Sequence, residues 1–137
     1  MSLDFEGKVA IVTGSGGGIG KGYALELAKR GAKVVVNDLG GAVDGSGGSL
    51  SAAETVVNEI EAAGGEAIAN GANVCSEDDV KNMVKETMEK WGRVDILINN
   101  AGILRDKSFA KMEWSDFVTV VNVHLMGSAL CAHTVFP

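Results

Sequence analysis

The residues best suited to chemistry are the glycines of 13–20 (TGSGGGIG), which directly follow the apolar run 9–12. An amphipathic run with Tyr23, Leu25 and Leu27 comes next, so the order is strand, glycine turn and helix. Glycines at such a corner let the chain reverse, let backbone approach a pyrophosphate and let the helix pack close to the sheet. The helix N-terminus would then direct free N–H groups and its positive dipole end at the anion. A flexible loop is the alternative interpretation, because a glycine-rich turn alone is weak evidence.

Asp38 is the next candidate, because it lies eighteen residues after Gly20 and near the end of the apolar segment 33–39. A carboxylate there can accept hydrogen bonds from the hydroxyls of an adenosine ribose, and it would repel a 2′-phosphate. Between Gly14 and Gly20 the sequence has no Arg or Lys to pair with such a phosphate. Together these features favour NAD over NADP, whereas Asp38 taken alone could be a solvated acid at a strand end.

The elements that must position these residues alternate between strand and helix four times. Apolar runs predict strands at 9–13, 33–39, 66–74 and 94–99, and helical spacing predicts helices at 19–30, 52–63, about 76–91 and 115–135. The glycine- and serine-rich segment 40–51 is predicted to be a surface loop, and 103–113 a polar loop. This alternation predicts an α/β fold, a Rossmann-type doubly wound parallel sheet with helices on both faces, in a single domain.

Composition limits the partners. The chain has 137 residues, 46% of them apolar, and a net charge of −6, which argues against nucleic acid or a membrane surface as a partner. Cys75 and Cys131 form neither a disulfide framework nor a metal set, so both are interpreted as small apolar filler in a reducing compartment. No signal peptide and no apolar run near the roughly 20 residues of a membrane span are apparent. We therefore expect a soluble intracellular domain without a metal.

Three other polar residues are weaker candidates. His124 and His133 lie nine residues apart on the last predicted helix, so they face different sides and cannot form a ligand pair. Packing or surface roles are expected for both. Lys21 could steer a phosphate, but an exposed helical lysine is the preferred interpretation.

Two motifs together, Thr13-Gly14-x-x-x-Gly18-Ile19-Gly20 and Asn99-Asn100-Ala101-Gly102, resemble the short-chain dehydrogenase/reductase family in order and spacing, as does Asn122. Within the family, segments 37–41, 49–50, 103–109 and 123–128 resemble the (3R)-hydroxyacyl-CoA dehydrogenase part of peroxisomal multifunctional enzymes of type 2. The resemblance implies a strand order of 3-2-1-4 and hydride transfer between NAD and a secondary alcohol or ketone. The implied reaction, part of fatty acid metabolism, converts 3-hydroxyacyl-CoA to 3-ketoacyl-CoA. It also implies a homo-oligomer through the last helix and a peroxisomal location, or a cytoplasmic one otherwise.

The resemblance also implies roles for individual residues. The pyrophosphate and adenosine ribose would be bordered by Gly14, Ser15, Gly17, Gly18, Ile19 and Gly20. Asp38 would hold the ribose hydroxyls, and Asn73-Val74 would lie beside the adenine, where relatives often have Asp-Val. Asn100, Ala101 and Gly102 would line the cofactor, while Asn99 would tie its strand to its neighbours. Asn122 would help to position the lysine and a water of a proton relay, with an ordinary polar helix residue as the alternative.

The catalytic Ser and Tyr-x-x-x-Lys of the family do not occur in these 137 residues, where Tyr23 is the only tyrosine and Leu27 follows it four places on. We therefore expect an NAD-binding portion that is incomplete at the C-terminus and inactive by itself. Its fourth strand would be an open edge, and the last helix would leave Phe117, Val120, Val121 and Leu125 partly uncovered. A companion chain could complete the sheet. The alternatives are a dinucleotide-binding module without catalysis and a chain that uses its edge only for assembly.

Overall fold

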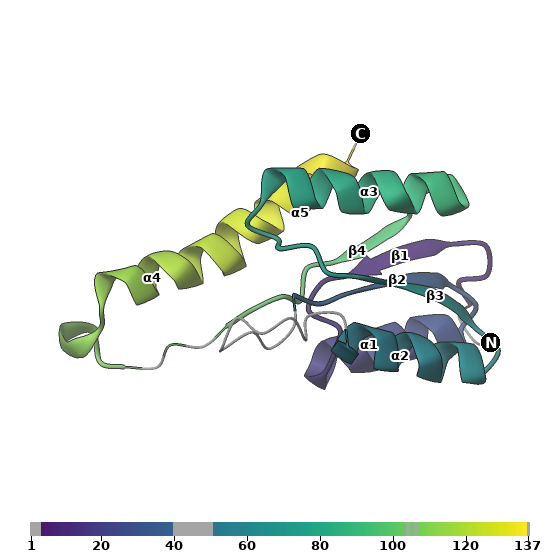
Figure 1. The fold of residues 1–137 in the computed structure, drawn as a ribbon, viewed down its shortest axis with the longest axis horizontal. Coiled ribbons are helices and arrows are strands. Elements are labelled where there is room, and N and C mark those ends of the chain that lie inside the picture. The colour runs from purple at the N-terminus through teal and green to yellow at the C-terminus, as the bar shows by residue number, and fades with distance from the viewer. Residues whose placement is uncertain (1–3, 40–50, 104, 106, 137) are drawn as a thin grey trace.

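The computed structural model describes residues 4–39, 51–103, 105 and 107–136, so most of the predicted loop 40–51 lies outside the described residues. Its centre is a parallel sheet of strands β1 (Val9–Val12), β2 (Lys33–Asn37), β3 (Glu66–Asn70) and β4 (Ile96–Ile98). The strand order is β3-β2-β1-β4 (Figure 1), and Ala10 pairs with Val34 on one side and Ile96 on the other. This confirms the doubly wound sheet and the order 3-2-1-4.

Helices cover both faces of the sheet. They are α1 (Gly18–Lys29), α2 (Ser51–Ala62), α3 (Glu77–Trp91), α4 (Trp114–Val121) and α5 (Gly127–Val135), with a 3₁₀ turn η1 (Phe109–Lys111) and a π-helical segment η2 (Asn122–Met126). Figure 1 shows α1 and α2 on one face, α3 and α5 on the other, and α4 reaching away from the sheet. The last predicted helix is therefore one rod, α4–η2–α5, with only its C-terminal part against the sheet.

The two helical layers receive alternate residues of the strands, as the period of two in a strand requires. Val12 and Val36 are fully buried toward α1 and α2, where Ile60 closes that core. Ile11 and Val35 point the other way into the core under α3 and α5, which also holds the side chains of Val80, Met83 and Cys131. Both faces are covered, and this explains why β1 and β2 have uninterrupted apolar sequences rather than alternating ones.

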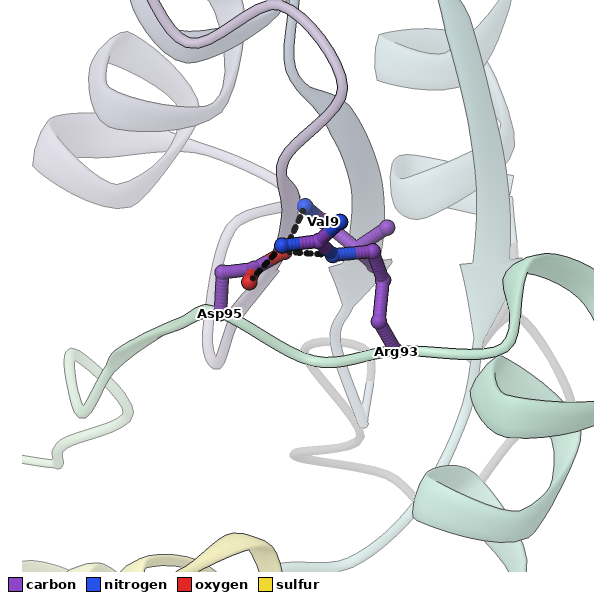
Figure 2. Close-up of polar contacts among 3 residues, drawn as sticks. All are labelled: Val9, Arg93 and Asp95. Carbon is purple, nitrogen blue, oxygen red and sulfur yellow. Dashed lines mark hydrogen bonds and ion pairs between the residues drawn. The ribbon is translucent and has the colours of Figure 1, made fainter.

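The amino ends of β1 and β4 are tied together by Asp95 (Figure 2). Asp95 Oδ2 accepts the backbone N–H of Val9 at 2.9 Å. Arg93 donates from Nε to Oδ2 and from Nη2 to Oδ1 of the same carboxylate, each at 2.7 Å. The hydrogen bond and charge of Arg93, helped by the Val9 N–H, lower the pKa of Asp95. The short strand β4 is thus held in register at the end opposite to the glycine turn.

Strand β3 ends at Asn70, four residues before the predicted end at Val74. The Asn70 Oδ1 atom accepts the N–H of Ala72 at 2.8 Å and the Nδ2 of Asn37 at 3.1 Å. Asn37 is buried and also donates to the Ala72 carbonyl at 3.1 Å, so it holds the chain where it turns away from the sheet. The strand therefore stops because a side chain of β2 captures the turn.

The remaining differences in element bounds are smaller. Strand β4 covers only 96–98 of the predicted 94–99, and the predicted polar loop 103–113 contains η1. The last helix starts at Trp114, and η2 interrupts its α-helical hydrogen bonding, with the Gly127 N–H bonding back to the Asn122 carbonyl. That bond spans five residues, the spacing of a π-helix.

The expectation that no segment has membrane-spanning length needs correction. Among the described residues, Trp114–Val135 is a helix of 22 residues that is long and apolar enough to cross a membrane, by length and composition only. Isolated polar residues interrupt its apolar run, so the high mean hydropathy of the helix is not apparent from the pattern of apolar residues. As expected, Phe117 and Leu125 are uncovered, with 40% and 63% of their surface exposed. The rod thus presents an extensive apolar surface, while Val120 and Val121 are half-buried.

Candidate cofactor-binding site

A cleft of about 340 Å³ lies at the carboxyl ends of the strands. It is lined by Gly14, Asn37, Asp38, Leu39, Ala72, Asn73, Val74, Asn100, Ala101, Gly102, Ile103 and Val123. The chain runs from β1 toward β2 and β3 on one side, and β4 lies on the other side of β1. This cleft is therefore at the switch point of the sheet, where open α/β sheets bind their ligands.

A larger hollow of about 810 Å³ lies at the opposite edge, near the amino ends of β2 and β3. Its charged lining residues include Lys29 and Lys33 together with Glu6, Glu59 and Glu66, so charges of both signs are mixed. The cleft at the carboxyl ends is the stronger candidate, because it lies at the switch point and beside the glycine turn.

Thr13 joins the glycine turn to the segment after β4. Its side chain is buried, and Oγ1 accepts the backbone N–H groups of Asn100 and Ala101, each at 3.0 Å. The hydroxyl can donate to the Ile98 carbonyl at 3.4 Å. In addition, Asn100 Nδ2 donates to the Gly14 carbonyl at 3.1 Å. The predicted residues Gly14, Asn100 and Ala101 are thus brought together by side chains at the ends of two neighbouring strands.

The glycines of the turn fall into two groups. A Cβ on Gly14 would lie 2.8 Å from the Ala101 Cα, and one on Gly20 would overlap the Asn100 amide, so both are needed for close packing. A Cβ on Gly17 or Gly18 would meet nothing within 4 Å. These two are exposed at the start of α1, and Gly18 has a φ of 57°, a value that favours glycine. The open backbone at the helix N-terminus fits the pyrophosphate of a dinucleotide.

Asp38 points back to the glycine turn from the end of β2. Its Oδ2 accepts the backbone N–H of Gly16 at 2.8 Å, and its own N–H bonds the Asn70 carbonyl at 3.0 Å. A Cβ on Gly16 would lie 2.6 Å from that oxygen, so the carboxylate can come this close only because residue 16 is glycine. The half-buried carboxylate therefore lies where the cleft meets the turn, which fits ribose hydroxyls as ligands.

Asn73 and Val74 line the cleft beyond β3. The Asn73 Oδ1 accepts the N–H of Cys75 at 2.9 Å, and its backbone N–H donates to Asp79 Oδ2 at 3.0 Å. Ser76 caps α3 by accepting the Asp79 N–H at 3.3 Å. The Asn73 carbonyl also accepts the Ser76 N–H at 2.9 Å, so the side chain and the backbone of Asn73 both hold the turn that leads into α3.

Several predicted residues lie beside the cleft rather than in its lining. Ser15 is fully buried, and its hydroxyl donates to the Val12 carbonyl at 2.8 Å, so its side chain supports the turn. Ile19 is 71% exposed at the rim. Asn122 begins η2 and is exposed, whereas its neighbour Val123 lines the cleft. Asn99 donates to the Ser128 carbonyl at 3.3 Å, so it ties β4 to α5 rather than to another strand.

The weaker candidates also have defined surroundings. Lys21 forms an ion pair with Glu59 at 3.0 Å between α1 and α2. Cys131 is buried, as the filler interpretation requires, and burial raises its pKa to about 11. Cys75 is exposed, so that interpretation is wrong for it. In the part of the chain that the structure describes, no group of three His, Cys, Asp or Glu residues is arranged to hold a metal ion.

Thr13 and Gly16 are among the residues of the site that were assigned no role from sequence. Thr13 was identified only as the first letter of the glycine motif, and Gly16 only as one of its variable positions. The position of Thr13 directly before Gly14 is a usable signal, because a buried hydroxyl at a strand end can bond neighbouring backbone groups. The part played by Gly16 has no local signal, since Asp38 lies 22 residues away.

Residues 8–137 match the family model described as short chain dehydrogenase. The chain is 59% identical over 128 residues to peroxisomal multifunctional enzyme A of Dictyostelium discoideum, covering 93% of this chain and 28% of that protein. It is 51% identical over 136 residues to the peroxisomal hydratase-dehydrogenase-epimerase of Saccharomyces cerevisiae, covering 99% and 15%. A 7α-hydroxysteroid dehydrogenase solved with NADH and 7-oxo glycochenodeoxycholic acid matches with a TM-score of 0.85 at 36% identity, covering 96% and 48%.

The chain spans less than half the length of each of these proteins. The matched region nevertheless contains the glycine turn, Asp38 and the Asn-Asn-Ala-Gly segment, of which Gly14, Asp38 and Asn100–Gly102 line the cleft. The fold, the two motifs and the family match agree, and the chain belongs to the short-chain dehydrogenase family.

Proposed function

We propose that this chain is the NAD-binding part of an oxidoreductase that transfers hydride between NAD and a secondary alcohol or ketone, most specifically 3-hydroxyacyl-CoA and 3-ketoacyl-CoA. The observation that carries the proposal is the placement of the Asp38 carboxylate 2.8 Å from the Gly16 N–H, where the switch-point cleft meets the glycine turn. A solved family member at 36% identity contains NADH. Bound NAD would supply the hydride acceptor, and this chain's residues would bind and orient it.

The proposed contacts follow from the site. The exposed backbone of Gly17 and Gly18 at the start of α1 would face the pyrophosphate, and Asp38 would accept the hydroxyls of the adenosine ribose. Asn73-Val74 would flank the adenine, and Asn100–Gly102 would line the opposite wall of the cleft. NAD is preferred over NADP in this proposal, because a 2′-phosphate would meet the negative charge of Asp38.

Nucleotide binding tests the proposal directly. The full chain is titrated with NAD and with NADP by calorimetry, together with Asp38→Ala, Gly18→Val and the control Asp78→Ala, an exposed acid on α3. Asp38→Ala should weaken NAD about tenfold or more and narrow the difference between NAD and NADP, since hydrogen bonds to a charged group contribute about 1.5–3 kcal/mol. Gly18→Val should abolish NAD binding in a folded chain. Unchanged NAD affinities in both variants would refute the assignment of the cleft as the NAD site.

The hydroxyacyl-CoA substrate is proposed from the relatives, one of which is named a hydratase-dehydrogenase-epimerase. Asn122 is proposed to position a proton relay, and the Ser, Tyr and Lys that move the proton in the family do not occur among these 137 residues. The chain by itself should therefore bind NAD without reducing it in the presence of a 3-hydroxyacyl-CoA. NADH formation by the chain alone would contradict this part of the proposal. Stable NAD binding without turnover also fits the alternative, a dinucleotide-binding module.

We further propose that a second copy of the chain covers the apolar rod α4–η2–α5. We also propose that the protein is peroxisomal, because two of its relatives are named as peroxisomal enzymes. Trp114 and Phe117 stack at 4.9 Å between ring centroids on the part of the rod that leaves the sheet, and Trp114 is 68% exposed. Among the described residues β4 pairs with β1 alone, so its other edge offers a second place for a companion chain. Light scattering should show a dimer or larger species that Trp114→Lys disrupts. A monomer at all concentrations, or binding to lipid vesicles instead, would refute self-association.

A further inference from the structure

His124 connects the last helix to the wall of the cleft. It lies in the π-helical segment η2, directly after the cleft-lining residue Val123. Its imidazole packs against Gly102: a Cβ built on that glycine would lie 2.6 Å from the His124 Cε1. The ring therefore occupies the space that a side chain at position 102 would need.

The same ring holds the backbone of the next residue, Ile103. His124 Nε2 lies 3.0 Å from the Ile103 nitrogen and 2.9 Å from the Ile103 oxygen. One ring nitrogen cannot serve both atoms at once: without a proton it accepts the N–H, and with a proton it donates to the carbonyl. The imidazole can thus hold Ile103 in either tautomer.

The wall held in this way is at one end of the cleft. Gly102 and Ile103 follow β4, whereas Asp38 follows β2, and β1 lies between these two strands. With neighbouring strands about 4.8 Å apart, the two ends of the cleft are separated by roughly 10 Å. If Asp38 holds the adenosine ribose, the part of NAD beyond the pyrophosphate extends toward Gly102 and Ile103. The next step therefore rests on the proposed function.

We propose that His124 is a positioning residue for the nicotinamide half of the cofactor, acting through the backbone of Gly102 and Ile103. It does not touch the cofactor in this proposal. It keeps the β4 end of the cleft in the shape that this half requires, while the adenosine half depends on Asp38 and the glycine turn. The role differs from that of Asn99, which joins β4 to α5 outside the cleft lining.

The test compares NAD with ADP, which contains the adenosine and pyrophosphate but lacks the nicotinamide riboside. The full chain, His124→Phe, His124→Gln and the control His133→Phe are titrated with both nucleotides. His133 is exposed on the same rod, nine residues away, so it reports the general effect of the substitution. His124→Phe should raise the Kd for NAD roughly three- to tenfold, the effect of one net hydrogen bond, and change the Kd for ADP less than twofold. His124→Gln, whose amide can reach the same backbone atoms, should restore most of the NAD affinity.

Other outcomes separate this inference from the proposed function. Equal losses for NAD and ADP, an unchanged NAD affinity in His124→Phe, or the same loss in His133→Phe would overturn the positioning role. If His124→Phe does not fold, His124→Asn carries the same test, because its shorter amide cannot reach Ile103. Failure of the unaltered chain to bind either nucleotide would overturn the proposed function instead. The hydrogen bond between His124 and the Ile103 backbone can then still be measured without nucleotide. Amide hydrogen exchange of Ile103 should be faster in the His124 variants than in His133→Phe.

Discussion

Replacement of Thr13 by Val tests the junction on which the site is built. The two side chains have similar shapes, so the change removes a hydroxyl from a buried position without opening a cavity. The N–H groups of Asn100 and Ala101, each 3.0 Å from that hydroxyl, lose their acceptor. An unsatisfied buried donor costs about 1–3 kcal/mol. Asn100 N–H retains the Ile98 carbonyl at 3.1 Å, so its share is small and the total loss is about 1–3 kcal/mol, mostly from Ala101.

Urea unfolding followed by circular dichroism measures this loss. With a denaturant slope of about 2 kcal/mol/M, the urea midpoint should fall by roughly 0.5–1.5 M. Thr87→Val is the matched control. Thr87 is as deeply buried, but its hydroxyl donates to the Met83 carbonyl at 2.8 Å within α3, so its removal strands no N–H group. That control should lose about 1 kcal/mol or less.

The comparison between the two variants decides the matter. Equal losses of stability for Thr13→Val and Thr87→Val, or a loss below about 1 kcal/mol for Thr13→Val, would refute the role of the Thr13 hydroxyl as acceptor for these N–H groups. A second consequence is expected for the ligand. Because Asn100 and Ala101 line the cleft, Thr13→Val should also weaken NAD in the fraction of protein that remains folded.

Three further changes have expected outcomes. The pKa of Asp95 is lowered in the folded chain, so its contribution to stability is present above about pH 4 and is lost as the pH falls through the folded-state pKa. Asp95→Asn should therefore flatten that part of an acid unfolding curve. An unchanged curve would contradict a stabilising role of Asp95. Cys75 should react with a thiol reagent in the folded chain and Cys131 only after unfolding, because Cys131 is buried with a pKa of about 11; two equally fast thiols would contradict this burial. Gly20→Ala should destabilise the chain by more than 1 kcal/mol, since a Cβ there has no room beside the glycine turn, whereas Gly22→Ala on the open side of α1 should be neutral or stabilising; calorimetric unfolding that ranks them otherwise would show that the turn can relax.

The order of elements could be predicted because its signals are local. Uninterrupted apolar runs at β1 and β2, glycines at turns and Ser76 at the start of α3 each act within a few residues of the feature that they determine. The confirmed strand order is instead a family expectation, since alternation alone does not say on which side of β1 the fourth strand lies. The placement of Asp38 at the end of β2 then follows from the same pattern.

The features that sequence reasoning missed depend on distant partners. The end of β3 is determined by Asn37, 33 residues before Asn70, and the acceptor role of Thr13 by N–H groups 87 and 88 residues later. No pattern within a single element contains this information. The apolar character of the last helix was missed for another reason. The mean hydropathy of a helix of 22 residues can be high even when isolated polar side chains interrupt its apolar run.

The π-helical segment Asn122–Met126 sets the rotational phase of the rod. Deleting one residue there would restore α-helical bonding, turn everything toward Trp114 by about 100° about the helix axis and draw it about 1.5 Å closer. The Trp114–Phe117 stack would then face another direction while α5 stayed on the sheet. In an alignment of related chains, this stretch should therefore keep a constant length. A gap confined to 122–126 would mark a relative whose rod presents a different side to its partner.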